Sequence, residues 1–250
     1  MKHLIGIDEA GRGPVIGPMI LAGTLICENN LDSVIKEFQI IGVKDSKKLT
    51  RKKREEVYEK LVELKKKNLI DFDFIIIQPS EIDEFVEGSG LNLNRLEIIK
   101  MIEIIHTLLK KYNGTFEIYI DCPSTNIKSY ISDFFSFLRK NHEIIYQSKN
   151  EVKVKSLDLD MYFIFSHKAD QKYPIVSASS IIAKVTRDRI IEEIKKKIDY
   201  DFGSGYSSDP KTMKFVKENF DKYDIFRKSW ETWKRQKEKK IIDFLKENDA

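Results

Sequence analysis

Short apolar runs alternate with helical patterns along most of the chain, and this alternation restricts the fold more than any other feature of the sequence. Short apolar runs bounded by turn residues are typical of buried strands, and apolar residues three and four positions apart are typical of amphipathic helices. The predicted strands are residues 4–7, 19–26, 72–77, 116–120 and 143–146, with a further one within 152–165. The predicted helices are residues 51–68, 93–112 and 177–198, and every periodic segment from 211 onward.

Strands interleaved with helices form a sheet that helices cover. The sequence therefore predicts an α/β fold, with a central mixed sheet flanked by helices and a C-terminal helical segment. No linker rich in Gly, Ser or Pro precedes that segment. We therefore expect residues 206–250 to pack on a domain formed by residues 1–205.

Composition excludes several classes of protein. A hydrophobic content of 41% in 250 residues is ample for a core and excludes a disordered chain. The formal net charge of only +4 argues against a protein that coats nucleic acid through charge alone, but it allows a basic face around an acidic pocket. Cys27 and Cys122 have no ligand-like spacing, so neither a zinc site nor a disulfide framework is predicted. Without a signal peptide or a membrane span, we expect a cytoplasmic protein.

The first candidate site follows the first apolar run, where Asp8 and Glu9 precede a turn containing Gly11, Gly13 and Pro14. Carboxylates at the end of a buried strand cost desolvation energy unless a cation or hydrogen bonds compensate. A helix N-cap is the alternative, but the two glycines and the proline that follow disfavour a first helical turn. This segment alone leaves a metal or phosphate site and a structural turn equally open.

Two more acids stand in related positions. Asp121 ends the predicted strand 116–120, so if that strand neighbours the first one, Asp121 and Asp8 share a sheet edge where both can reach one hard cation. One such acid is typical of a turn, whereas two favour a site. Asp170 precedes a helix start rich in small residues, where Ser177 and Ser180 could offer hydroxyls to a phosphate. The alternative is a solvated loop acid beside a helix that merely packs closely.

Tyr206 lies in a glycine-rich loop, residues 201–210, where it could stack on a sugar or base or could anchor the loop internally. The four histidines are scattered, and only His167, close to Asp170, is considered as a nearby polar group. Trp230 and Trp233 are left open between a contact with nucleic acid and a bracing role.

Five motifs in chain order resemble ribonuclease HII, the type 2 ribonuclease H, in its archaeal form. They are Asp8-Glu9-Ala10-Gly11-Arg12-Gly13-Pro14, Asp45-Ser46-Lys47-Lys48-Leu49, Asp121 after its strand, the block from Lys168-Ala169-Asp170 to Lys184, and Gly203-Ser204-Gly205-Tyr206. The resemblance implies a ribonuclease H-like fold. It also implies an endonuclease that cuts the RNA strand of RNA–DNA hybrids and cuts 5′ of ribonucleotides embedded in duplex DNA, leaving 5′-phosphate and 3′-hydroxyl ends.

The resemblance also assigns roles to residues. It implies two-metal-ion catalysis with Mn²⁺ or Mg²⁺ and hybrid or ribonucleotide-containing duplexes as partners, and we expect a monomer without membrane contact. The implied metal ligands are Asp8, Glu9, Asp121 and Asp170. The turn of Gly11, Arg12 and Gly13 would approach the ribose 2′-hydroxyl, and Tyr206 would stack at the junction of ribonucleotide and deoxyribonucleotide. The implied phosphate contacts are Lys47, Ser177, Ser180 and Lys184. Two residues depart from the family pattern, Ser207 in place of a proline and Ser179 in place of an alanine.

Three other functions compete with this interpretation. A resolvase or an integrase-like nuclease of the same superfamily would also gather acids at strand ends, and a non-catalytic hybrid-binding module could use them as caps. A small-molecule phosphatase would not explain the glycine-arginine-glycine turn or the Tyr206 loop. An all-deoxy duplex distinguishes a resolvase or an integrase-like nuclease from a ribonuclease, which would not cut it. Metal-dependent cleavage distinguishes a ribonuclease from a non-catalytic binding module.

Overall fold

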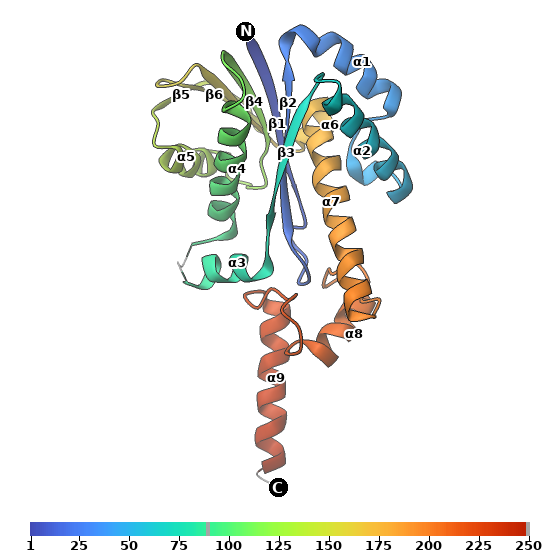
Figure 1. Ribbon diagram of the computed structural model, residues 1–250. Coiled ribbons are helices and arrows are strands. Elements are labelled where there is room, and N and C mark those ends of the chain that lie inside the picture. Colours follow the sequence, from blue (N-terminus) through green and yellow to red (C-terminus); the bar gives the residue numbers. More distant parts are fainter. Residues whose placement is uncertain (89–90, 249–250) are drawn as a thin grey trace. The chain divides into compact units, whose positions relative to one another are not determined.

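The structure is a computed structural model that describes residues 1–88 and 91–248, with side chains described up to residue 242. It contains a mixed seven-stranded sheet (Figure 1). The strand order is β3-β2-β1-β4-β7-β6-β5. β1, β4 and β7 run parallel, and β1–β2, β7–β6 and β6–β5 pair antiparallel. The strands are β1 (Lys2–Ala10), β2 (Met19–Cys27), β3 (Asp71–Ile77), β4 (Thr115–Asp121), β5 (His142–Gln147), β6 (Glu151–Ser156) and β7 (Met161–Ser166).

Helices fill most of the remaining described chain, and several begin at a capping side chain. The Thr50 hydroxyl accepts the Lys53 N–H at the start of α2, and Asp209 accepts the Lys211 N–H at the start of α8. The helices are α1 (Leu31–Ile41), α2 (Arg51–Lys66), α3 (Pro79–Asp83), α4 (Leu93–Leu109), α5 (Ile127–Leu138), α6 (Ala169–Lys172), α7 (Pro174–Ile198), α8 (Pro210–Asn219) and α9 (Glu231–Asn248), with short turns η1 (Glu28–Asn30), η2 (Ser46–Lys48) and η3 (Glu84–Gly88).

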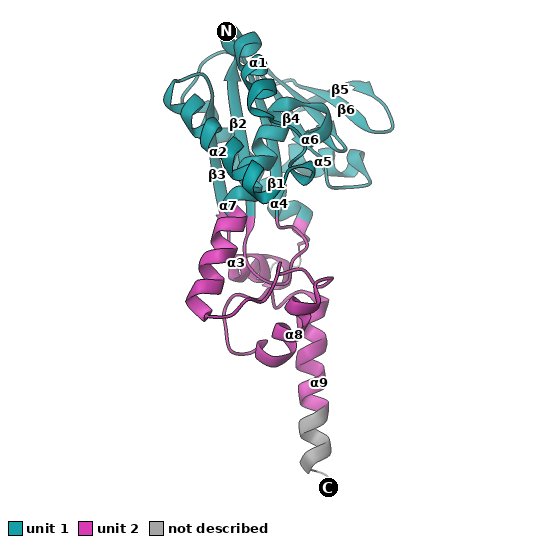
Figure 2. Cartoon of the chain, turned by 90° about the vertical axis from the view of Figure 1, so that its right-hand side faces the viewer, with its two compact units in different colours: residues 1–10, 20–75, 94–186 teal, residues 11–19, 76–93, 187–250 magenta. Residues whose placement is uncertain are grey.

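The chain divides into two compact units, coloured separately in Figure 2. Unit 1 comprises residues 1–10, 20–75 and 94–186, and unit 2 comprises residues 11–19, 76–93 and 187–250. The chain passes from unit 1 into unit 2 directly after Ala10, again after Ile75 within β3, and a third time within α7. The predicted boundary after residue 205 falls inside unit 2 and stays a prediction.

In unit 1 helices cover both faces of the sheet. Ile5 and Ile7 of β1 belong to a buried apolar cluster with residues of α4 and α5. On the other face α7 lies directly against β1, since a Cβ atom built on Gly6 would be 2.5 Å from the carbonyl carbon of Ile175. Only glycine permits this approach, which brings the start of α7 to the strand that carries Asp8.

Unit 2 has its own apolar core. It joins residues 15 and 16, which follow the glycine-rich turn, to α7, α8 and the segment before α9. The buried members are Val15, Ile16, Ile191, Phe202, Phe215, Val216, Phe220 and Phe226. A single antiparallel bridge pairs Ile16 with Phe226. The glycine-rich turn is therefore anchored at its C-terminal side by residues more than two hundred positions away.

The predicted fold class is confirmed, and several element boundaries differ from prediction. The region 152–165 contains parts of two strands, β6 and β7, rather than one. β1 does not end at Asp8 but continues to Ala10, because Asp8 and Glu9 pair with Ala22 and Leu21 of β2. Helices α1 and α5 were not predicted; both are short, although the apolar residues of each lie on one helical face.

Candidate active site

Asp8 and Asp121 lie side by side at one edge of the sheet in unit 1. β1 and β4 are parallel neighbours with Ile7 opposite Ile120, so the next residue on each strand is a carboxylate. Residues in register on neighbouring strands share a face, and such strands lie about 4.8 Å apart. The condition for a shared site, that these two strands are neighbours, is met.

Asp170 joins them from α6, which follows β7. The Ala169 N–H donates to Asp121 Oδ1 at 2.6 Å, and this bond fixes the start of α6 against the end of β4. Asp170 is 1% exposed and Asp8 is 5% exposed, so both carboxylates are withdrawn from water. Lys47 Nζ lies 3.5 Å from Asp170 Oδ2 and supplies the nearest positive charge.

Burial and mutual repulsion raise the pKa values of these acids. Burial, followed by the charge of Asp121, raises the pKa of Asp8 well above its usual value, although hydrogen bonds from Ser180 and the Glu9 N–H oppose the shift. Burial also raises the pKa of Asp121, which the Ala169 N–H lowers and Asp170 raises. The protein alone does not fully compensate the charge that it concentrates here.

The donor set fits a hard divalent cation. Asp170 Oδ1 is buried and has no hydrogen-bond partner among the described residues, and Mg²⁺ and Mn²⁺ favour such carboxylate oxygens. Asp8, Asp121 and Asp170 could hold the cation, and Glu9 follows Asp8 on the opposite face of the strand. Within the described residues, no group of three or more His, Cys, Asp or Glu side chains already surrounds a single metal position.

The segment of residues 45–49 places Lys47 beside these acids. Asp45 Oδ1 accepts the Lys47 N–H at 2.9 Å and caps η2, and Ser46 Oγ lies 2.9 Å from Ser180 Oγ. Burial by itself lowers the pKa of Lys47, but Asp170, Asp8 and Asp45 outweigh burial and raise it. Lys47 is therefore held in its charged form. The sequence showed this motif but did not assign Asp45 a position beside the acids.

The serines predicted to contact phosphate are engaged within the protein. Ser177 Oγ donates to the Asp170 carbonyl at 2.6 Å, and the Ser180 hydroxyl is hydrogen-bonded to Asp8. Both residues thus help to hold the segments that carry the acids, and their contact with phosphate stays a prediction, as does that of Lys184, which is half-buried on α7. His167 is also engaged, with Nδ1 3.0 Å from the Cys122 carbonyl oxygen.

The glycine-arginine-glycine turn and the Tyr206 loop both belong to unit 2 and touch each other there. The Gly205 carbonyl accepts the N–H groups of Val15 and Ile16 at 2.9 and 3.2 Å. A Cβ atom built on Gly13 would lie 3.7 Å from the Tyr206 ring, which is 36% exposed. The tyrosine therefore presents an accessible ring beside the turn, as a stacking residue must.

Two buried arginines of unit 2 were missed by sequence reasoning. Arg187 donates to the carbonyls of Ile16 and Pro18, at 3.3 Å each, and its guanidinium lies 5.5 Å from the centre of the Tyr206 ring. Arg227 donates to carbonyls of the turn itself. Neither arginine stands in a motif, so the sequence carries no local signal for these contacts.

Gly11 adopts a φ of +83°, and a Cβ there would lie 2.3 Å from Arg187 Nε, which requires glycine.

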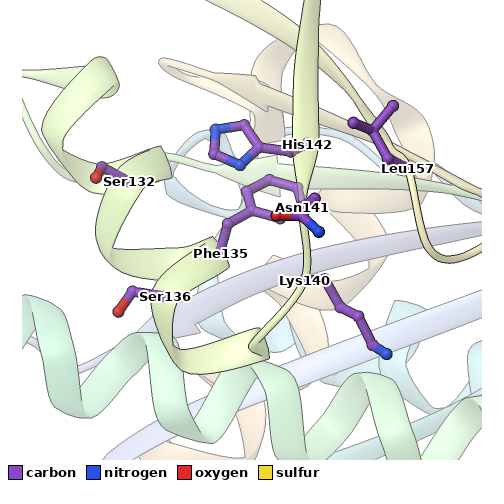
Figure 3. Close-up of a pocket in the computed structure, with 7 residues that line it drawn as sticks. All are labelled: Ser132, Phe135, Ser136, Lys140, Asn141, His142 and Leu157. Carbon is purple, nitrogen blue, oxygen red and sulfur yellow. The ribbon is translucent and has the colours of Figure 1, made fainter.

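A cavity in unit 1 lies away from the acids. It has a volume of about 530 Å³ and is lined by Ser132, Phe135, Ser136, Lys140, Asn141, His142 and Leu157 (Figure 3). Glu151 at the start of β6 pairs with Ser166, which is beside Asp121, so the end of β6 near Leu157 lies at the opposite edge of the sheet. The cavity therefore has no part in the acidic site.

None of the helices in the described chain has the length and apolar character needed to cross a bilayer.

Comparisons with known proteins bear on the family and the fold. The family model described as ribonuclease HII matches residues 5–233. A protein named ribonuclease HII from Methanococcus maripaludis is 42% identical over 253 residues, covering 98% of this chain and 93% of the relative. The crystal structure of the ribonuclease H2 from Pyrococcus horikoshii matches with a TM-score of 0.72 and 36% identity over 95% of this chain and 98% of that one. A PCNA:RNase HII complex from Archaeoglobus fulgidus matches with a TM-score of 0.64 and 33% identity over 87% of this chain and 86% of that one.

Replacing Asp8 by Asn is expected to stabilise the protein at neutral pH when a chelator removes divalent cations. The folded state raises the pKa of Asp8, so its contribution to stability is present at low pH and is lost as pH rises through the raised pKa. Asn removes the ionisation and its cost. Denaturant unfolding of both proteins between about pH 5 and pH 8 should show an advantage of Asp8→Asn that grows with pH.

Asp71→Asn is the matched control, since Asp71 is also a buried aspartate of unit 1. Burial by itself raises the pKa of Asp71, but hydrogen bonds from Lys111 and Lys65 lower it overall, so this substitution should destabilise the protein. Mg²⁺ or Mn²⁺ at a hundred times its Kd should add about 2.7 kcal/mol to wild type and to Asp71→Asn. A gain of the same size in Asp8→Asn would contradict a cation site at Asp8.

Proposed function

The chain belongs to the ribonuclease HII family, and on that premise we propose that it cuts 5′ of ribonucleotides embedded in duplex DNA as well as the RNA strand of RNA–DNA hybrids. Family membership makes it a metal-dependent endoribonuclease, a hydrolase of phosphodiester bonds. The observation that carries the proposal is the pairing of Ile7 with Ile120, which sets Asp8 and Asp121 side by side. The expected products carry 5′-phosphate and 3′-hydroxyl ends.

We propose that Asp8, Glu9, Asp121 and Asp170 hold two divalent cations, Mn²⁺ or Mg²⁺. When bound, such cations activate a water molecule for in-line attack and neutralise the charge that develops on the leaving oxygen. The raised pKa of Asp8 and the unpartnered Asp170 Oδ1 support this assignment, because both mark uncompensated carboxylates.

The other residues of unit 1 act on the phosphodiester and on the acids. Lys47 is 77% exposed at its side chain, remains charged, and attracts the scissile phosphate towards Asp170. Ser180 and the Glu9 N–H hold Asp8, and the Ala169 N–H holds Asp121, so these carboxylates keep their orientation without substrate. Preorganised groups of this kind need no rearrangement when charge develops during the reaction.

Recognition of RNA is assigned to unit 2. The ribose 2′-hydroxyl is what distinguishes RNA from DNA at a given nucleotide. Gly11, Arg12 and Gly13 would approach it through their backbone, and the exposed Tyr206 ring would stack at the junction between ribonucleotide and deoxyribonucleotide. Ser207, where a proline is common in the family, leaves the loop with one restriction fewer, although Asp209 still accepts the Ser204 N–H at 2.7 Å.

Asp8→Asn and Asp121→Asn are each expected to reduce cleavage of a duplex with one embedded ribonucleotide by at least a thousandfold, as is typical when charge stabilisation is lost. The assay uses Mg²⁺ or Mn²⁺ and maps the cut by the length of the labelled strand. Asp133→Asn, which alters a half-exposed acid paired with Arg95, should retain wild-type activity. An all-deoxy duplex should not be cut, and cleavage of it would favour a resolvase-like enzyme.

Tyr206→Ala is expected to slow cleavage of a single embedded ribonucleotide more than cleavage of a continuous hybrid. A stacked base contributes about 1–3 kcal/mol, and only the embedded substrate depends on one junction. Comparison of kcat/KM for the two substrates measures the effect, with Tyr206→Phe as the control that keeps the ring. Equal losses on both substrates would remove the stacking role.

We further propose PCNA as a protein partner, because the relative from Archaeoglobus fulgidus was solved as a complex with PCNA. Ile241 and Ile242 of α9 are each 50% exposed, an apolar pair suited to an interface. Replacing both with Asp should abolish binding to PCNA in a pull-down with purified proteins. Ile145→Asp, which alters an isoleucine 49% exposed on β5, is the control and should bind normally.

A further inference from the structure

The glycine-arginine-glycine turn is held by side chains from the other end of the chain, all within unit 2. The Arg227 side chain is 0% exposed, and its guanidinium donates to three carbonyl oxygens. Nη2 donates to Gly11 at 2.5 Å, Nη1 to Arg12 at 2.8 Å and Nε to Gly17 at 3.1 Å. One planar group thus binds the first two carbonyls of the turn and a third carbonyl four residues beyond its end.

These bonds also fix the direction of the amide groups in the turn. In a trans peptide the carbonyl of one residue points opposite to the N–H of the next, and the described chain contains no cis peptide bond. Because Arg227 binds the carbonyls of Gly11 and Arg12, the N–H groups of Arg12 and Gly13 point away from the guanidinium. Two neighbouring amide donors are therefore directed to the same side of the turn.

Trp230 completes the arrangement. Its Nε1–H donates to the Gly13 carbonyl at 3.1 Å, and its ring lies 4.9 Å from the Arg227 guanidinium. The backbone of Arg227 also donates to the Val15 carbonyl at 2.9 Å. Three consecutive carbonyls, those of Gly11, Arg12 and Gly13, are therefore held from the segment that precedes α9.

We propose that Arg227, supported by Trp230, is a positioning residue that orients the amides of the Gly11–Gly13 turn towards the ribose 2′-hydroxyl. This inference rests on the proposed function, in which that turn contacts the ribose. A guanidinium is suited to the task because its donors form a rigid planar fork, whereas a lysine ammonium is a point charge on a flexible stem. Arg227 thereby acts on substrate selection without touching the substrate.

The test compares two duplexes that differ only in one group, a 2′-hydroxyl or a 2′-fluorine on a single embedded nucleotide. The measured quantity is the ratio of their kcat/KM values, with the uncut all-deoxy duplex as baseline. In Arg227→Lys this ratio should fall by about tenfold, as expected for the loss of one well-oriented hydrogen bond between a turn amide and the 2′-hydroxyl. In Trp230→Phe, which loses only the Nε1 donor, it should fall by about threefold.

Phe215→Leu is the control for destabilisation alone. Phe215 is a buried member of the same apolar core, and its side chain has no hydrogen-bond donor for the carbonyls of the turn. This variant should lower the stability of unit 2 and keep the wild-type ratio, and all three variants should keep the cation-induced stabilisation that arises in unit 1.

The outcomes separate the two proposals. If wild type does not cut the 2′-hydroxyl duplex, the proposed function fails. If wild type cuts it and both Arg227→Lys and Trp230→Phe keep the wild-type ratio, the positioning role is overturned while the function stands. If Arg227→Lys does not fold, the ratio in Trp230→Phe decides. A fall of equal size in Phe215→Leu would reduce the effect to general loosening of the core and would also overturn the positioning role.

Discussion

The register between β1 and β4 is the constraint on which the acidic site depends. With Ile7 opposite Ile120, each strand places an aspartate one residue later on the same face. Two carboxylates at strand spacing and out of water repel each other, and neither can leave because each belongs to a paired strand. The surrounding elements respond to that repulsion: α6 supplies the Ala169 N–H, α7 supplies Ser180, and the segment at η2 supplies Lys47.

The approach of α7 to β1 makes this response possible. Gly6 allows the helix backbone to touch the strand, and the small residues at the start of α7 continue the contact towards Asp8. Ser179, which stands where an alanine is common in the family, lies 2.8 Å from both the Gly6 carbonyl and Thr24 Oγ1. Its hydroxyl is buried and hydrogen-bonded, so the departure adds a polar tie between helix and sheet without disturbing the acids.

The sequence predicted the strands and the acids that stand at their ends, because apolar runs and abrupt carboxylates are local signals. It could not predict the register, which arises from the pairing of strands more than a hundred residues apart. It also did not predict the contacts of Arg187 and Arg227. Both arginines bind backbone carbonyls, which every residue carries, so the sequence contains no partner side chain that would indicate these contacts. Helix α5 was missed for a different reason, since Ile127, Tyr130, Ile131 and Phe134 recur at helical spacing and the signal was local but short.

The dependence of a glycine turn on a buried arginine follows from the conformational freedom of glycine. A turn that must let its backbone approach a ribose cannot carry side chains at Gly11 or Gly13, and glycine loses more conformational entropy on folding than any other residue. Gly11 and Gly13 have no side chains to offset that loss, but their carbonyls can accept hydrogen bonds. Arg227 and Trp230 provide the donors from a distant segment. On the proposed function, the Gly-Arg-Gly turn and the Arg227 segment therefore act as one recognition element, and a change in either would alter how the amides of the turn are presented.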